Sequence, residues 1–160
     1  MTKEYSVRAV HCNHRDSDEK VYEALLRATE PLERSWQKLE KAGRIVRKFN
    51  MGHRNVARFE GRRRELVDDA VCRAVLRLLR ERTSAVLVAA DTFCQDESGD
   101  HTDYGNYLPL LQEFDVEYAE SNLPPFAEYE VPGGGCMFQR YTLNRCFSQA
   151  DEVVSVAKMK

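Results

Sequence analysis

The feature that most constrains the fold is the segment 84–90, which reads Ser-Ala-Val-Leu-Val-Ala-Ala. An apolar run this short, with polar residues on both sides, is typical of a strand that is covered on both faces. Such strands occur in parallel sheets, whose crossover connections place helices on the sheet faces. Strand and helix patterns alternate along the chain around this run, as they do in a sheet built through right-handed crossovers. We therefore expect a three-layer α/β fold with a mostly parallel sheet flanked by helices.

The other elements follow from the spacing of apolar residues. We expect strands at 5–11, 44–49, 115–118 and 153–157, and helices at 18–39, 65–82 and 107–114. Ser17 is a suitable N-cap for the first helix. Pro31 interrupts that helix, because proline lacks a backbone donor and disfavours the helical conformation of the residue before it. The pattern predicts either a kink at Pro31 or two abutting helices.

Two alternating segments near the end of the chain, at 128–131 and 136–143, predict a β-hairpin inserted before the last strand. The residues between them read Pro-Gly-Gly-Gly. Glycines of this kind could also form a phosphate cradle, but a phosphate loop leads directly into a helix and a strand is expected here. The pattern favours a turn.

Charge, length and apolar content limit the class of protein. The 160 residues fit one domain, since domains average about 150 residues, and the net charge of −2 gives no global attraction to nucleic acid or to an anionic membrane. No apolar run approaches the roughly 18 residues of a membrane span, and the start of the chain lacks the apolar core of a secretion signal. We therefore expect a cytoplasmic protein for which nucleic acid is an unlikely partner.

The five cysteines are odd in number and none are spaced as Cys-x-x-Cys, so neither a disulfide framework nor an iron–sulfur or zinc site is predicted. Cys72 lies on an apolar helical face and is expected in the core. The densest group of metal-ligand types is His11, Cys12 and His14, which could bind a divalent metal together with Asp91, His101 or Asp103. Their spacing matches no metal signature, so no metal ligands are assigned, although the sequence leaves metal binding by this cluster open.

Ligands of open α/β sheets bind at the carboxyl ends of the strands, so the polar residues there are candidates for a site. Lys48 and Asn50 end one expected strand, Asp91 follows another, and Lys158 and Lys160 follow the last. A lysine in an apolar strand end is costly to bury without a partner. Lys48 either reaches past the strand tip to water or is held there for an anionic ligand, and the pattern does not separate the two.

Arginines form a second candidate site. Five arginines and one glutamate in residues 54–64 give a local charge of +4, just before the helix expected at 65–82. Cations are unfavourable at a helix N-terminus, so an anion bound by Arg62, Arg63 and Arg64 would relieve the repulsion. The alternative is a solvated loop whose arginines pair with the carboxylates of the protein.

The order of these segments resembles a family of uncharacterised proteins called domain of unknown function 362. Two motifs carry the resemblance: Lys48-Phe49-Asn50, where the family has Lys-Pro-Asn, and Ala-Asp-Glu-Val-Val-Ser-Val-Ala-Lys-Met-Lys at 150–160. In the second motif Ala157 replaces a proline, and the chain stops before the Thr-His of the family. The resemblance implies that Lys48, Asn50, Lys158 and Lys160 share a polar site, with Asp91 a weaker addition.

The resemblance also implies that the chain is the N-terminal part of a longer domain, and that it associates with a ferredoxin-type module absent from these residues, because some family members carry iron–sulfur modules. The leading functional hypothesis is a domain that binds a small anionic ligand at the strand ends, as part of a truncated enzyme or a redox-associated protein. The alternative is a noncatalytic module that docks an acidic partner or nucleic acid through residues 54–64. No reaction, substrate or cofactor is predicted.

Overall fold

The computed structural model describes residues 7–51, 56–92 and 107–158. In chain order the elements are α1 (Asp18–Thr29), α2 (Glu33–Leu39), β1 (Arg44–Phe49), β2 (Arg58–Phe59), β3 (Arg62–Arg63), α3 (Asp69–Arg82), β4 (Val86–Asp91), α4 (Leu108–Glu113), β5 (Glu117–Glu120), β6 (Phe126–Glu130), β7 (Arg140–Asn144), the 3-10 turn η2 (Arg145–Phe147) and β8 (Glu152–Val156).

The central sheet has four strands in the order β5-β4-β1-β8, and every neighbouring pair is parallel. In the centre of the sheet, Val46 of β1 lies beside Val88 of β4 and Val153 of β8. The arrangement confirms the α/β fold and the parallel sheet predicted from the apolar run at 84–90.

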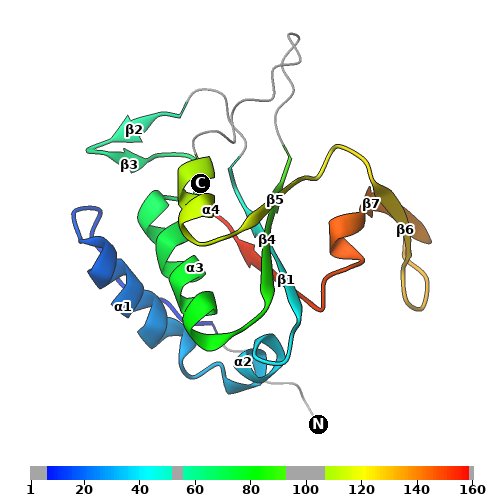
Figure 1. Cartoon of the computed structure of the whole chain (residues 1–160), viewed down its shortest axis with the longest axis horizontal. Helices are drawn as coiled ribbons and strands as arrows, with labels where there is room; N and C mark the ends of the chain where they lie inside the picture. The colour runs from blue at the N-terminus through cyan, green and yellow to red at the C-terminus, as the bar shows by residue number, and fades with distance from the viewer. Residues whose placement is uncertain (1–6, 52–55, 93–106, 159–160) are drawn as a thin grey trace.

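The two faces of the sheet are covered differently (Figure 1). The helices α1 to α4 lie on one face, and the β6–β7 hairpin with η2 lies on the other. Ile45 and Leu87 face the main core under the helices, whereas Val46 and Val88 pack with Cys146 of η2 on the opposite face. The sheet is thus the middle layer between the helices and the hairpin.

Capping residues set the ends of the helices. Ser17 caps α1 by accepting a hydrogen bond from the backbone N–H of Lys20, and the chain around Pro31 divides the first helical region into α1 and α2, as expected. α3 begins later than residue 65 because Asp68 has an extended backbone and accepts a hydrogen bond from the N–H of Ala70. Leu66, just before the cap, is buried all the same, so the apolar pattern extends beyond the helix.

The strand predicted at 5–11 is wrong for residues 7–11, which form no regular structure and are exposed. Residues 5 and 6 lie outside the described ranges. Val7 is 96% exposed. Alternation yields a strand only where a neighbouring strand supplies hydrogen bonds and buries one face, and in the described structure these residues have no such neighbour.

One carboxylate, just before β8, joins the start of β8 to the start of β1. Asp151 accepts hydrogen bonds from the backbone N–H groups of Gly43 and Arg44, each at 2.9 Å. Its own N–H donates to the carbonyl oxygen of Arg44. These bonds hold β8 beside β1, where it forms one end of the sheet.

The predicted hairpin is present, as β6 and β7, with Tyr129 opposite Tyr141. Gly133 and Gly134 in its turn have φ angles of +79° and +77°, which other residues rarely adopt. The turn therefore needs glycines for its backbone geometry. No helix follows this turn, as a phosphate loop would need; the chain enters β7 at Arg140, four residues later than the predicted start at 136.

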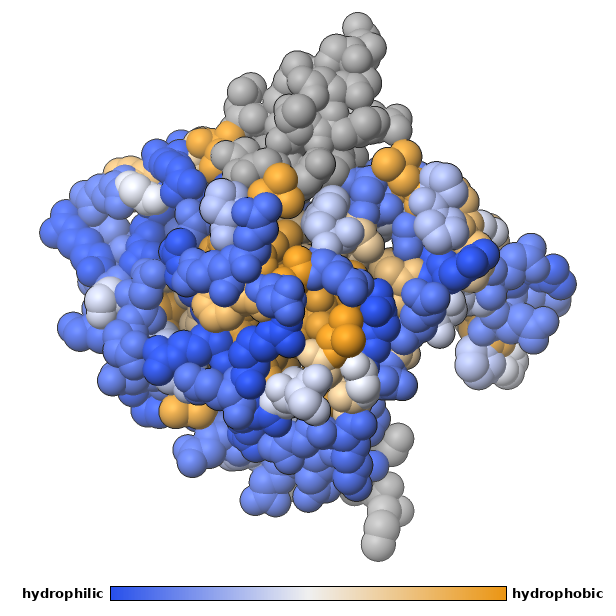
Figure 2. Space-filling view, viewed as in Figure 1, coloured by the Kyte–Doolittle hydropathy of each residue, from blue (hydrophilic) through white to orange (hydrophobic). Residues whose placement is uncertain are grey.

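The surface is mainly hydrophilic on the face shown in Figure 2, where hydrophobic residues appear in small areas between elements. In the described ranges no helix is both long and apolar enough to cross a membrane.

Candidate functional site

A cavity of about 440 Å³ lies where the carboxyl ends of the sheet strands meet the β6–β7 hairpin. β1 contributes Lys48, and the end of β4 contributes Asp91 and Thr92. Ser121 follows β5, and the hairpin closes the other side with Thr142 of β7. The volume falls in the range of about 300–1,000 Å³ that is typical of small-molecule sites.

The central contact of this cavity is an ion pair between Lys48 and Asp91. The amine of Lys48 lies 3.0 Å from Oδ1 of Asp91. The lysine side chain is 47% exposed, whereas Asp91 is 3% exposed. The other carboxylate oxygen, Oδ2, accepts a hydrogen bond from the backbone N–H of Met51. Asp91 is therefore a fixed buried acceptor, and it holds the amine of Lys48, which also lines the cavity.

Strand register brings the two residues together. Lys48 of β1 lies beside Ala90 of β4, so Asp91 is one position further along the neighbouring parallel strand. Val46, on the same face of β1 as Lys48, packs in the small core under the hairpin. Lys48 thus lies beyond the apolar part of this face, near the carboxyl end of β1, where its partner is the carboxylate of Asp91.

Hydroxyl groups line the cavity around this ion pair. Ser121 is placed by a hydrogen bond of 2.9 Å from its N–H to the carbonyl oxygen of Asp91. Its Oγ is buried and makes no hydrogen bond with any residue that the structure describes. Thr92 and Thr142 add hydroxyls from two other segments, and Phe147 provides an apolar wall. Buried polar atoms are usually satisfied, so an unpaired hydroxyl at a cavity indicates capacity to bind a polar group.

The hairpin wall depends on Asn144, which no sequence pattern considered above indicates as a site residue. The Asn144 amide nitrogen donates to the carbonyl oxygens of Glu120 and Leu123, at 3.0 and 2.8 Å. Its side-chain oxygen accepts a hydrogen bond from the N–H of Cys146. Asparagine before a short turn is a known capping signal, which could have identified the residue, but not its contacts across the sheet edge.

Two other predicted site residues, Asn50 and Lys158, are absent from the lining of this cavity. The carbonyl oxygen of Asn50 accepts a hydrogen bond from the N–H of Val67, at the entry to α3. The amine of Lys158 donates to the carbonyl oxygen of Arg63, at 3.0 Å. The structure therefore brings Lys48 and Asp91 together and places Lys158 near β3. Lys160 lies outside the described residues.

The arginine cluster forms the small β2–β3 hairpin over its described residues, 56–64. Arg62 lies 2.7 Å from Asp68, and Arg63, which is 1% exposed, lies 2.8 Å from Asp69. The Arg63 guanidinium also stacks over the ring of Tyr107 at 3.9 Å. Both charges thus meet carboxylates at the start of α3. Arg64 is exposed, and its N–H donates to the carbonyl oxygen of Ala57.

The His11, Cys12 and His14 cluster is exposed. Nε2 of His14 lies 2.6 Å from Glu60, and Sγ of Cys12 lies 3.5 Å from Asp16. In the described part of the chain, no group of three His, Cys, Asp or Glu residues is arranged to hold a metal ion. His101 and Asp103 lie outside the described residues.

No protein-family model, curated protein or solved structure matches the chain. The resemblance to domain of unknown function 362 therefore stays a prediction based on the two sequence motifs.

Proposed function

We propose that this domain binds a small anionic ligand in the cavity between the sheet edge and the β6–β7 hairpin, with Lys48 as the cationic group. The observation that carries the proposal is the ion pair in the cavity lining: the Lys48 side chain is half-exposed, and its amine lies 3.0 Å from the buried carboxylate of Asp91. An ammonium group has three N–H donors, and this contact uses one of them. The others can bind a phosphate or carboxylate oxygen.

The surroundings of Lys48 support recognition of such a group. The charge of Asp91 is already compensated, because one oxygen faces Lys48 and the other accepts the N–H of Met51. Ser121 offers a hydroxyl that has no partner within residues 7–51, 56–92 and 107–158, and Thr92 and Thr142 line the same cavity. Hydrogen bonds between charged and neutral groups in a partly enclosed site are stronger than between neutral groups alone. A ligand with one anionic group and adjacent polar atoms could contact both the lysine amine and these hydroxyl groups.

Thermal unfolding with inorganic phosphate, sulfate and citrate tests the proposal. We expect at least one anion to raise the melting temperature of the wild type, and Lys48→Met to remove the effect while Lys48→Arg retains part of it. Lys158→Met is the matched control, since that lysine lies outside the cavity, and should leave the stabilisation unchanged. Loss of the effect in Lys158→Met or Arg64→Ala, with retention in Lys48→Met, would contradict the proposal.

A further inference from the structure

The outer edge of β8 has no strand beside it among the described residues. β8 pairs with β1 on one side and ends the sheet. A free strand edge presents unpaired N–H and C=O groups, and proteins usually protect such edges with charges, proline or a bulge. Residues 153–156 are Val, Val, Ser and Val, and Val153 is 53% exposed. The middle of this edge thus carries none of the side chains that prevent pairing with another strand.

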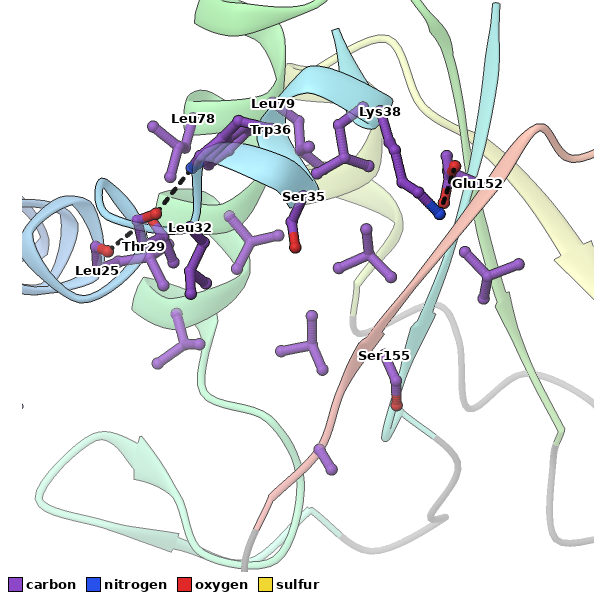
Figure 3. A pocket seen from close by; sticks show the side chains of 17 residues that line it. Leu25, Thr29, Leu32, Ser35, Trp36, Lys38, Leu78, Leu79, Glu152 and Ser155 are labelled. Carbon is purple, nitrogen blue, oxygen red and sulfur yellow. Dashed lines mark hydrogen bonds and ion pairs between the residues drawn. The ribbon is translucent and has the colours of Figure 1, made fainter. Parts of the chain in front are cut away.

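An apolar groove of about 660 Å³ runs along this edge, between β8 and helices α1, α2 and α3 (Figure 3). Leu25, Leu32 and Trp36 line it from the helices, and Val154 and Val156 line it from β8. At one end Lys38 of α2 points to Glu152 of β8, with 3.8 Å between the charged atoms. The groove and the free edge form one continuous surface that a further strand would cover.

Charges lie only at the two ends of the β8 edge, and they are of opposite sign. Glu152 begins the strand, and Lys158 follows it by two residues. Both lie on the helical side, since Glu152 meets Lys38 of α2 and Lys158 meets the carbonyl oxygen of Arg63. Two such strands in antiparallel orientation would place a positive end against a negative end twice.

We propose that two copies of this chain associate through the free edges of β8, antiparallel about a two-fold axis at Ser155. The two four-stranded sheets then become one continuous sheet. In this register Glu152 of one copy lies opposite Lys158 of the other, and Val154 lies opposite Val156. Opposite charges in directly facing positions stabilise an antiparallel pair, whereas like charges destabilise it.

Symmetry makes this register distinctive. A two-fold axis perpendicular to the sheet keeps the helical side of both copies on one side, so only residues of the same face can lie opposite each other. The axis lies between the two β8 strands and must therefore be level with one residue, which faces its own copy across the axis. Moving the axis to the level of Val154 or Val156 places one member of the charged pair opposite a valine. With the axis level with Ser155, both Glu152 and Lys158 face an opposite charge.

Sedimentation equilibrium over a range of protein concentrations tests the proposal with charge reversals. The wild type should form dimers, and Lys158→Glu or Glu152→Lys should each weaken dimerisation by about tenfold, because two facing pairs become repulsive. An equimolar mixture of the two single variants should dimerise as heterodimers, since the reversed charges then face opposite ones. Lys41→Glu, at an exposed lysine after α2, is the matched control and should dimerise as the wild type does.

Circular dichroism establishes that each variant keeps the wild-type fold before its association is measured. A wild type that stays monomeric at all concentrations would overturn the proposal, as would dimers that neither single reversal weakens. A dimer lost in both variants but not restored in their mixture would also contradict the proposed register.

Discussion

The Lys48 amine and the Asp91 carboxylate form an ion pair of 3.0 Å between adjacent strands, and the same carboxylate accepts the N–H of Met51. The buried Asp91 side chain thus fixes both the Lys48 amine and the backbone that follows β1. Its two roles can be separated by substitution, because asparagine retains an acceptor oxygen and alanine does not.

We predict that Asp91→Ala lowers the free energy of unfolding by about 1–3 kcal/mol, because the buried N–H of Met51 loses its acceptor. Asp91→Asn should cost less than about 1 kcal/mol, since the amide oxygen can still accept that bond and the ion pair with half-exposed Lys48 contributes little. Urea denaturation of the two variants measures the difference. Equal losses would show that the charge, and not the hydrogen bond, is the stabilising element.

Arg47 is completely buried in β1, and none of its three guanidinium nitrogens has a hydrogen-bond partner in the described part of the chain. Burial and, to a smaller extent, the nearby positive charge of Arg80 together lower its pKa to about 9. We predict that Arg47→Met raises the free energy of unfolding by about 1–4 kcal/mol, since replacing a buried charge by an apolar side chain of similar length removes the desolvation cost.

The matched control for Arg47 is Arg140→Met, which removes an exposed arginine paired with Glu128 and should change stability by less than about 0.5 kcal/mol. Both variants are compared by urea denaturation at pH 7. A loss of stability in Arg47→Met larger than in the control would contradict the account of Arg47 as an unpaired buried charge.

Asp68 should contribute to the pH dependence of stability. Burial alone would raise its pKa, but hydrogen bonds from the N–H groups of Arg63 and Ala70, and from the Arg62 guanidinium, outweigh burial and lower the pKa. Because the folded-state pKa is lower than the unfolded one, the stabilisation is complete above the ordinary pKa of about 4 and is lost as the pH falls through the folded value.

We therefore predict that Asp68→Asn is destabilising at pH 6 and that its deficit relative to the wild type shrinks on acidification below pH 4. Chemical denaturation of both proteins at several pH values measures this difference. Glu128→Gln, at an exposed side chain, is the control and should show a small deficit at every pH. A constant deficit for Asp68→Asn across the range would rule out the proposed linkage.

Neighbouring arginines of the β2–β3 hairpin should respond differently to truncation. Arg63 is buried, contacts Asp69 and stacks on Tyr107, so Arg63→Ala should cost about 3 kcal/mol or more. Arg64 is exposed, so Arg64→Ala should change stability by less than about 0.5 kcal/mol. Thermal unfolding compares the two, and similar effects would show that the buried contacts of Arg63 do not stabilise the fold.

The parallel sheet was predictable because its signal is local. The apolar run at 84–90 identifies a strand with two covered faces, and alternation around Lys48 places Val46 on the same face. The predicted N-terminal strand shows the limit of such a signal, because alternation at Val7 does not specify a neighbouring strand. A local pattern thus predicts that a segment can form a strand, but not which neighbouring strand it pairs with.

The candidate site was predictable only in part for the same reason. Strand ends in a parallel sheet share one edge, which is why Lys48 and Asp91 could be placed together. The direction of Lys158 depends on its contact with Arg63, and the cavity wall depends on Asn144 crossing to Glu120. These contacts join residues 95 and 24 positions apart, and no periodic pattern encodes them.

The most direct test of the proposed ligand site is a titration with inorganic phosphate followed by amide proton–nitrogen NMR. The account predicts saturable shifts at the backbone amides of Thr92, Ser121 and Thr142 in the wild type, and their loss in Lys48→Met. Saturable shifts confined to residues 58–64, or none at the cavity amides for any anion that stabilises the protein, would contradict it.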